Sequence, residues 1–209
     1  MDDELVFYTN PMSRGQLTRW MLEEVGAPYR TEIVAYGPEM KSEAYLAINP
    51  MGKVPAIRHR GQVVTEGAAI CAYLADAFPG AGLAPAADSP ARAPYYRWLF
   101  FGAGPVEQAV FNTWAGFSPG PDKSRAMGYG DFDITLDTLE GALTGGDYLA
   151  GDAFSAADLY VGGFLGFVLG FGIVPKRPAF EAYVARLDAR PARQRAKAID
   201  AALIAQTPT

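Results

Sequence analysis

The side chains best suited to chemistry lie in four short segments of the sequence. These segments read YTNPMSR at residues 8–14, NPMGKVPAI at 49–57, VTEGAAI at 64–70 and FSAADLY at 154–160. Ser13 and Arg14 precede one predicted helix, and Glu66 precedes another, so that a hydroxyl, a guanidinium and a carboxylate stand at helix N-termini. A hydroxyl donor, a cation and free backbone N–H groups together stabilise a negative charge. The first segment is therefore suited to stabilising an anion.

Cysteine and histidine are too scarce for most other kinds of catalytic site. The chain has one cysteine, Cys71, and one histidine, His59. These numbers exclude an internal disulfide, a cysteine-type zinc site, a CxxC redox pair and a multi-histidine metal site, so we predict no metal. We expect Cys71 to be a buried, inert thiol. We expect His59 to lie at the surface, beside the turn at residues 60–61.

The composition predicts a folded chain with a large core and few kinds of partner. Of the 209 residues, 50% are hydrophobic and 20% are charged. The net charge of −5 argues against nucleic acid, which requires a basic surface. The N-terminus lacks the basic and apolar regions of a signal peptide, so we expect a cytoplasmic location. Residues 159–174 carry no charge but are fewer than the about 20 that a transmembrane helix needs, so we expect a buried helix and no membrane contact.

The first 79 residues alternate between strand and helix patterns. An apolar run at 5–8, a helix face ending at Gly26 and a second apolar run at 29–34 predict a strand, a helix and a parallel strand. The expected elements that follow are a short helix at 42–48, an antiparallel hairpin of 54–57 with 62–64, and a helix opening at 65–67. This order predicts a small mixed sheet covered by helices.

The second half of the chain has helical periodicity throughout. Residues 80–94 are rich in Pro, Gly and Ala and are typical of a linker. Helices are expected at 95–117, 125–143, 156–171, 180–187 and 192–203. Basic residues between 176 and 197 have helical spacing, which predicts a solvated helix face. We therefore predict an α/β domain at 1–79, a linker at 80–94 and an all-α domain at 95–209.

Taken together, the four segments resemble the cytosolic glutathione transferase family, in its bacterial type, over nearly the whole chain. The pairing of NPMGKVP at 49–55 with TEGAAICAYLAD at 65–76 is specific, and LEEVG at 22–26, RPA at 190–192 and the FSAAD box agree with it. The resemblance implies a thioredoxin-like N-terminal domain that binds glutathione as co-substrate. It also implies a helical-bundle C-terminal domain that shapes the electrophile pocket, and a homodimer.

The resemblance assigns glutathione-binding roles to six residues. A cis bond between Val54 and Pro55 would turn the backbone of Val54 towards the cysteine of glutathione. Glu66 would bind the γ-glutamyl amino group, and the backbone of Gly67 would bind the γ-glutamyl carboxylate; the family usually has serine at position 67. The remaining two candidates, for the glycine carboxylate of glutathione, are Lys53 and Lys41.

Ser13 is the residue expected to activate the glutathione thiol. A free thiol has a pKa near 8.5 and is only a few per cent thiolate at pH 7. Ser13 would act as a hydrogen-bond donor to the thiolate, with help from the helix N-terminus and a guanidinium. An alignment on residues 22–24 places the serine of serine-type classes at Met12 and the cysteine of the bacterial cysteine-type class at Arg14. Tyr8, Asn10 and Arg14 therefore remain candidates.

The function implied is attack of the activated thiolate on a small hydrophobic electrophile. The electrophile pocket is expected to include Met12, Trp98, Phe101 and Trp114. Two other functions remain open. One is a non-catalytic interaction module, which the departures at Met12 and Gly67 allow, and the other is a glutathione-dependent isomerase or lyase acting by ether cleavage.

Overall fold

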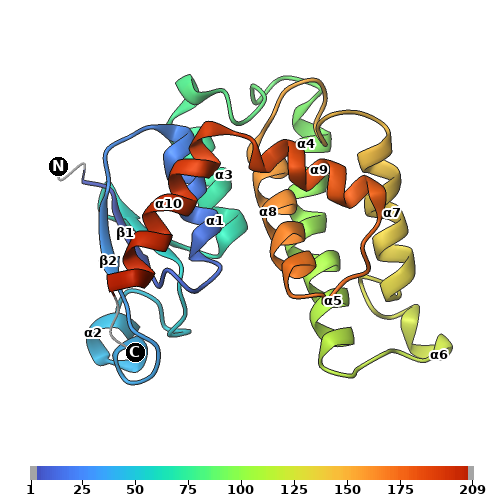
Figure 1. The fold of residues 1–209 in the computed structure, drawn as a ribbon, viewed down its shortest axis with the longest axis horizontal. Helices are drawn as coiled ribbons and strands as arrows, with labels where there is room; N and C mark the ends of the chain where they lie inside the picture. Colours follow the sequence, from blue (N-terminus) through green and yellow to red (C-terminus); the bar gives the residue numbers. More distant parts are fainter. Residues whose placement is uncertain (1–3, 207–209) are drawn as a thin grey trace. The chain divides into compact units, whose positions relative to one another are not determined.

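The computed structural model describes residues 4–206, which form two compact units. The first unit contains the residues up to 81 together with those from 189 onwards, and the second contains residues 82–188. Figure 1 shows a mixed sheet with its helices in the first unit and helices alone in the second. This is the α/β plus all-α class expected from the sequence.

The sheet of the first unit has four strands in the order β2-β1-β3-β4. The strands are β1 (Val6–Thr9), β2 (Arg30–Ile33), β3 (Ala56–His59) and β4 (Gln62–Thr65). Strand β1 is parallel to β2 and antiparallel to β3, and β3 is antiparallel to β4. The β3–β4 turn has positive φ at both Arg60 (52°) and Gly61 (74°), which matches the twist of a two-residue hairpin. The predicted βαβ-ββα order, with its thioredoxin-like arrangement, is confirmed.

Helices of the first unit pack against both faces of the sheet. They are α1 (Gly15–Val25), η1 (Glu39–Lys41), α2 (Glu43–Leu46), α3 (Gly67–Ala77), η2 (Pro79–Ala81) and α10 (Pro191–Gln206). The side chain of Phe7 contacts Arg19 of α1, whereas the adjacent Tyr8 contacts Tyr45 of α2. Because side chains alternate across a strand, α1 and α2 lie on opposite faces.

Helix α10 belongs to the first unit, which differs from the predicted boundary of the helical domain at 95–209. It packs along α1 (Figure 1), where the Nε atom of Arg19 lies 2.6 Å from an oxygen of Asp200, and both groups are buried. Arg190, just before α10, donates two hydrogen bonds to Glu24 at 2.6 and 2.9 Å. The sequence shows these charges at ordinary helical spacing, and only the fold brings their partners together.

The second unit is built around the buried helix α8. Its elements are α4 (Arg92–Phe101), η3 (Gly102–Val106), α5 (Glu107–Trp114), α6 (Pro121–Ser124), α7 (Phe132–Thr144), α8 (Ala156–Gly170) and α9 (Pro178–Asp188). A Cβ atom at Gly162 would lie 2.1 Å from the Cδ1 atom of Leu187, so this glycine permits the close approach of α9. No helix within residues 4–206 is both long enough and apolar enough to cross a membrane.

Three predictions about the second unit need correction. The expected helix at 95–117 is interrupted by a π-helical segment containing Pro105, which lacks a backbone N–H donor, and it ends at Trp114. The helix expected from residue 125 begins at Phe132, where the Asp131 side chain accepts a hydrogen bond from Ile134 N. Part of the expected linker packs on this unit, since Leu83 is buried and its carbonyl accepts from Ala156 N at 2.7 Å.

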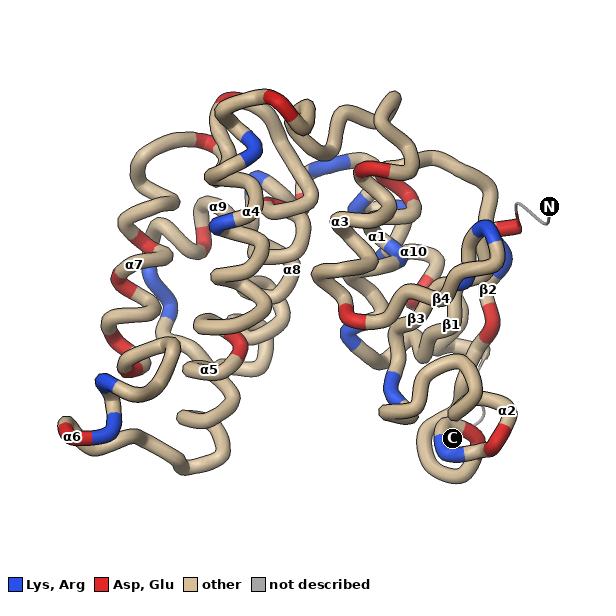
Figure 2. Tube along the Cα trace, turned by 180° about the vertical axis from the view of Figure 1, so that it is seen from behind, with Lys and Arg blue, Asp and Glu red and all other residues tan. Residues whose placement is uncertain are grey.

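The expected solvated face at 176–197 is also wrong in part. Arg177 donates to Asp137 and to Glu140 of α7, each at 2.7 Å. Figure 2 shows the acidic residues that follow one another along α7. Arg190 is paired with Glu24, as described above, so basic residues at the start and in the middle of this region join elements of the fold.

The two residue types that the sequence has only once are both buried. Burial raises the pKa of the Cys71 thiol to about 12, which agrees with the expected inert cysteine. His59 is 2% exposed, so the prediction of a surface histidine is wrong. Its Nδ1 atom lies 3.0 Å from the Tyr73 hydroxyl, and its ring stacks on Phe78, because the end of β3 lies under α3.

Asp158 is the central polar group of the second unit. It forms the predicted capping box with Ser155 at the start of α8, and one of its oxygens also accepts hydrogen bonds from Leu149 N at 2.7 Å and from the Tyr183 hydroxyl at 2.8 Å. Burial raises the pKa of the Asp158 carboxyl, and these donors oppose that shift in part. The carboxylate therefore joins α8, α9 and the turn before α8 through acceptor oxygens alone.

We predict that Asp158→Asn lowers the free energy of unfolding by about 3 kcal/mol, because the amide N–H₂ would face buried donors. Urea denaturation of both proteins measures the change. The matched control is Asp152→Asn, at an exposed position in the turn before α8. This substitution should change the free energy of unfolding by less than about 0.5 kcal/mol. Equal effects of the two substitutions would contradict the role given to Asp158.

Candidate functional site at one end of the sheet

The strand registers bring three of the four chemical segments to one end of the sheet. Ala56 pairs with Tyr8 on one side and with Thr65 on the other. The loop after β1, the residue before β3 and the residue after β4 therefore emerge at the same end. These are the loop at residues 10–14, Pro55 and Glu66. The end of β2 lies there too, since Val34 N donates to Thr9 O at 2.8 Å.

The loop between β1 and α1 is held by the buried side chain of Asn10. Its Nδ2 atom donates to Val34 O at 3.2 Å, and its Oδ1 atom accepts from Met12 N at 3.0 Å. Both ends of the amide are thus used inside the chain. This arrangement makes Asn10 a positioning residue for the loop, although it was a candidate donor to the thiol.

Ser13 lies at the start of α1 with its hydroxyl already hydrogen-bonded. The Oγ atom donates to Asn10 O at 2.7 Å and accepts from Gly15 N at 2.9 Å. Burial raises the pKa of the Tyr36 phenol, in the loop after β2, and a hydrogen bond with Ser13 opposes this rise in part. Gly15 permits this tight turn, because a Cβ atom there would lie 2.1 Å from Thr9 Oγ1.

The remaining loop candidates point elsewhere or are exposed. Tyr8 packs in the cluster with Val34, Met40 and Tyr45, on the α2 face of the sheet. Arg14 is exposed immediately before α1 and provides no side-chain cap to that helix. Among these candidates, Ser13 is the residue whose hydroxyl lies at the start of α1, where it accepts a hydrogen bond from Gly15 N.

The peptide bond between Val54 and Pro55 is cis, as the resemblance implied. The preceding turn is fixed because Lys53 O accepts hydrogen bonds from the Tyr45 hydroxyl at 2.7 Å and from Asn49 Nδ2 at 2.8 Å. Neither the N–H nor the C=O of Val54 has a hydrogen-bond partner among residues 4–206. The backbone of Val54 can therefore pair with a ligand in the manner of a strand.

The two lysine candidates differ in their surroundings. The Nζ atom of Lys41 donates to Met51 O and Gly52 O, each at 3.0 Å, and so stabilises the turn before the cis bond. Lys53 is exposed, and its ammonium has no partner among the described residues. The charge of Lys53 is thus available to an anion, whereas Lys41 has an intramolecular role.

Glu66 stands at the N-terminus of α3 in an unusual backbone conformation. Its φ of 65° lies in the region that favours glycine, which costs a non-glycine residue about 1–3 kcal/mol. Its side chain is exposed and does not cap α3, so the first N–H groups of the helix, beginning with Gly67, have no side-chain acceptor within residues 4–206. A carboxylate and free N–H groups therefore stand side by side, which suits a ligand carrying both an amine and a carboxylate.

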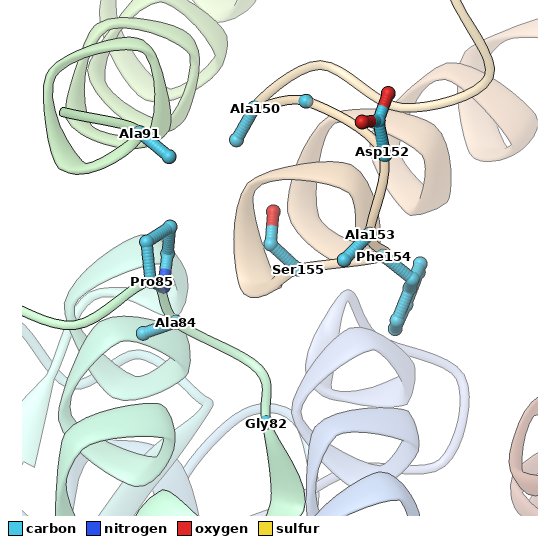
Figure 3. A pocket seen from close by; sticks show the side chains of 10 residues that line it. Gly82, Ala84, Pro85, Ala91, Ala150, Asp152, Ala153, Phe154 and Ser155 are labelled. Carbon is cyan, nitrogen blue, oxygen red and sulfur yellow. The ribbon is translucent and has the colours of Figure 1, made fainter. Parts of the chain in front are cut away.

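The four residues expected in the electrophile pocket have very different exposures. Trp98 is 7% exposed and packs edge-on against Phe101, whereas Trp114 is 69% and Met12 is 56% exposed. None of the four lines the cavity of about 340 Å³ in the second unit. Figure 3 shows that this cavity lies between the segment at 82–91 and the turn at 150–155. Their role in binding an electrophile stays a prediction.

Sequence reasoning did not single out Tyr36. This residue follows β2 in a loop with no motif, and nothing in its spacing connects it with Ser13. The only available signal was that residues after β2 must end at the same edge of the sheet as residues after β1, because the two strands are parallel. That rule places a loop but does not choose a side chain.

Comparison with known families agrees with this geometry in both units. The model described as glutathione S-transferase, N-terminal domain, matches residues 12–77, and the one described as glutathione S-transferase, C-terminal domain, matches residues 133–191. A glutathione S-transferase named GST-4.5 from Xanthomonas campestris pv. campestris is 30% identical over 161 residues, covering 74% of this chain and 78% of that protein.

Solved structures of bacterial proteins show the same fold. A glutathione transferase from Methylococcus capsulatus is 31% identical, with a TM-score of 0.79, and the match covers 95% of this chain and 99% of the other. A glutathione S-transferase from a sphingomonad, solved with glutathione, is 29% identical, with a TM-score of 0.74, over 94% of this chain and 98% of the other. With both domains matched, in sequence and in fold, the chain belongs to the glutathione S-transferase family.

Proposed function

We propose that this protein is a glutathione transferase that stabilises the thiolate of glutathione at Ser13 for attack on a small hydrophobic electrophile. The observation that carries the proposal is the meeting of the Ser13 loop, the cis Val54–Pro55 bond and the Glu66 helix start at one end of the sheet. These three features offer separate binding groups for the parts of one extended tripeptide. Similar proteins solved with glutathione support the choice of ligand.

Each polar part of glutathione has a matching group at this end of the sheet. The free N–H and C=O of Val54 suit the backbone of the cysteine. The Glu66 carboxylate suits the γ-glutamyl amino group, and the N–H groups from Gly67 onwards suit the γ-glutamyl carboxylate. Lys53 suits the glycine carboxylate better than Lys41 does, because the ammonium of Lys41 already binds two carbonyl groups.

Thiol activation follows from the placement of Ser13. The thiol proton leaves to water, and the Ser13 O–H then donates a hydrogen bond to the sulfur anion, while the N-terminus of α1 adds a favourable dipole. Ser13 gives up no proton, since an alkyl hydroxyl is far too weak an acid. The held thiolate then forms a bond to the electrophile, aided by the proximity of the two reactants. We propose that the enzyme acts in the cytoplasm as a homodimer, with the electrophile bound by the helical domain through Trp98, Phe101 and Trp114.

The decisive experiment is a pH titration of glutathione with excess protein, followed by thiolate absorbance in the ultraviolet. We expect an apparent thiol pKa about two units below the value of free glutathione. A titration curve equal to that of free glutathione would overturn the proposal and favour a non-catalytic interaction module. Activity with a substrate that isomerises or loses an ether-linked group, but not with conjugation substrates, would move the reaction to the isomerase or lyase class.

We predict that Ser13→Ala raises the pKa of the bound thiol by about one unit, because one charge-assisted hydrogen bond to the thiolate is lost. The affinity for S-methylglutathione, which cannot form a thiolate, should change little. The same titration with the variant measures the shift. An unchanged pKa would remove Ser13 from thiol activation.

We predict opposite effects of Glu66 substitutions on binding and on stability. Glu66→Gln should weaken glutathione binding about tenfold through loss of the charge, whereas Glu43→Gln, at another exposed glutamate in a first helical turn, should not. Glu66→Gly should weaken binding as well but raise the free energy of unfolding by up to about 1 kcal/mol, because glycine tolerates the positive φ. Calorimetric binding and urea denaturation measure the two quantities, and unchanged affinity in Glu66→Gln would mean that the γ-glutamyl site is misplaced.

A further inference from the structure

The Ser13 hydroxyl is placed by a tight turn made of residues 10–13. Asn10 O accepts a hydrogen bond from Ser13 N at 2.9 Å, which closes the turn, and Pro11 occupies its second position. Proline fixes its own φ at about −65°, so the main freedom left in the turn is rotation of the peptide plane between Pro11 and Met12. The orientation of this central peptide decides where the next residue, Ser13, directs its side chain.

Two side-chain amides hold the central peptide at its two polar groups. Gln16, in the first turn of α1, donates from Nε2 to Pro11 O at 2.7 Å. Met12 N, the other polar group of the same peptide, donates to Asn10 Oδ1 at 3.0 Å. The backbone of Gln16 adds a hydrogen bond from its N–H to Ser13 O at 3.2 Å. Rotation of the central peptide would therefore break two side-chain hydrogen bonds at once.

Hydrogen bonds, more than packing, hold this part of the loop. The side chain of Met12 is 56% exposed, and Ser13 is only partly buried. Asn10 is buried and is itself anchored to the end of β2, because its Nδ2 atom donates to Val34 O at 3.2 Å. Gln16 supplies the corresponding anchor from α1. The turn is thus held between a strand end and a helix, each through one amide side chain.

We propose that Gln16 is a positioning residue for thiol activation, which acts by keeping the Ser13 hydroxyl directed at the sulfur of glutathione. The inference rests on the proposed function and adds a residue from outside the four segments that first indicated a site. The amide of Gln16 transfers no proton and contacts no reacting atom. Without it the central peptide rotates more freely, so the Ser13 O–H is aligned with the sulfur for a smaller fraction of the time. A hydrogen bond to an anion weakens as its alignment is lost, and the thiolate is then less stable.

The test is a set of thiol titrations with the full-length protein and its glutamine variants. Gln16→Met removes the amide but keeps an unbranched side chain of similar size and helix propensity. The matched control is Gln108→Met, at an exposed glutamine that is likewise the second residue of a helix, α5. We expect Gln16→Met to raise the pKa of bound glutathione by about 0.5 unit and Gln108→Met to leave it unchanged. The two variants should have similar urea midpoints, so that a pKa shift confined to Gln16→Met reports on the loop.

The dependence on Ser13 is tested in the Ser13→Ala background. Because Gln16 acts through the serine hydroxyl, Gln16→Met should not raise the thiol pKa further once that hydroxyl is gone. An equal rise in both backgrounds would overturn the inference, since Gln16 would then act on the thiolate without Ser13. The affinity of Gln16→Met for S-methylglutathione, which has no thiolate, should stay within about twofold of the wild type. A loss of that affinity with an unchanged thiol pKa would also overturn the inference, by making Gln16 a residue for binding alone.

Failure of this inference differs from failure of the proposed function. A wild-type pKa below that of free glutathione, together with an unchanged pKa in Gln16→Met, would overturn the role of Gln16 and leave the proposed function intact. A wild-type titration equal to that of free glutathione would remove the proposed function, and the role of Gln16 with it.

Discussion

The position of the site depends on the pairing of one buried residue, Ala56. This residue pairs with Tyr8 of β1 and with Thr65 of β4, and it has no exposed surface. Pairing on both sides fixes the register of β3, since a slip of one residue would turn every side chain of that strand to the opposite face of the sheet. The same pairings that bury the core therefore set where Ser13, Pro55 and Glu66 emerge. Function and stability share this constraint, so substitutions that loosen β3 would disturb both at once.

Buried charges join distant parts of each unit, and each has several hydrogen-bond partners. Arg19 donates to Asp200, to the Tyr29 hydroxyl and to Thr31 Oγ1, at 2.6, 3.2 and 3.3 Å. Asp158 plays the corresponding part in the second unit as an acceptor. Removing one partner of such a group leaves an uncompensated buried charge, which costs more than the intact pair contributes. These contacts therefore act chiefly to select one packing of α10 on α1, and of α9 on α8, over alternatives that would leave a charge unpaired.

Much of the fold could be predicted from the sequence because its signals are local. The strand and helix periods, the Arg60-Gly61 turn and the capping box of Ser155 and Asp158 all depend on residues near one another, and the resemblance to a family supplied the cis bond at Pro55. The errors arose where a distant partner decides the outcome. His59 is buried by Tyr73 and Phe78, and α10 is held by charges on α1.

The hydrogen bonds of the Ser13 loop explain how an anion can be stabilised there at low cost. When the Ser13 hydrogen turns from Asn10 O towards a sulfur anion, the carbonyl still accepts from Ser13 N at 2.9 Å, so no buried acceptor is left without a donor. The Ser13 oxygen likewise keeps its bond from Gly15 N. The loop thus exchanges a bond to a neutral carbonyl for a stronger bond to a charged atom, and its backbone does not need to move. Under the proposed function, such a site favours the thiolate over the neutral thiol, because only the anion accepts strongly enough to draw the hydrogen away from Asn10.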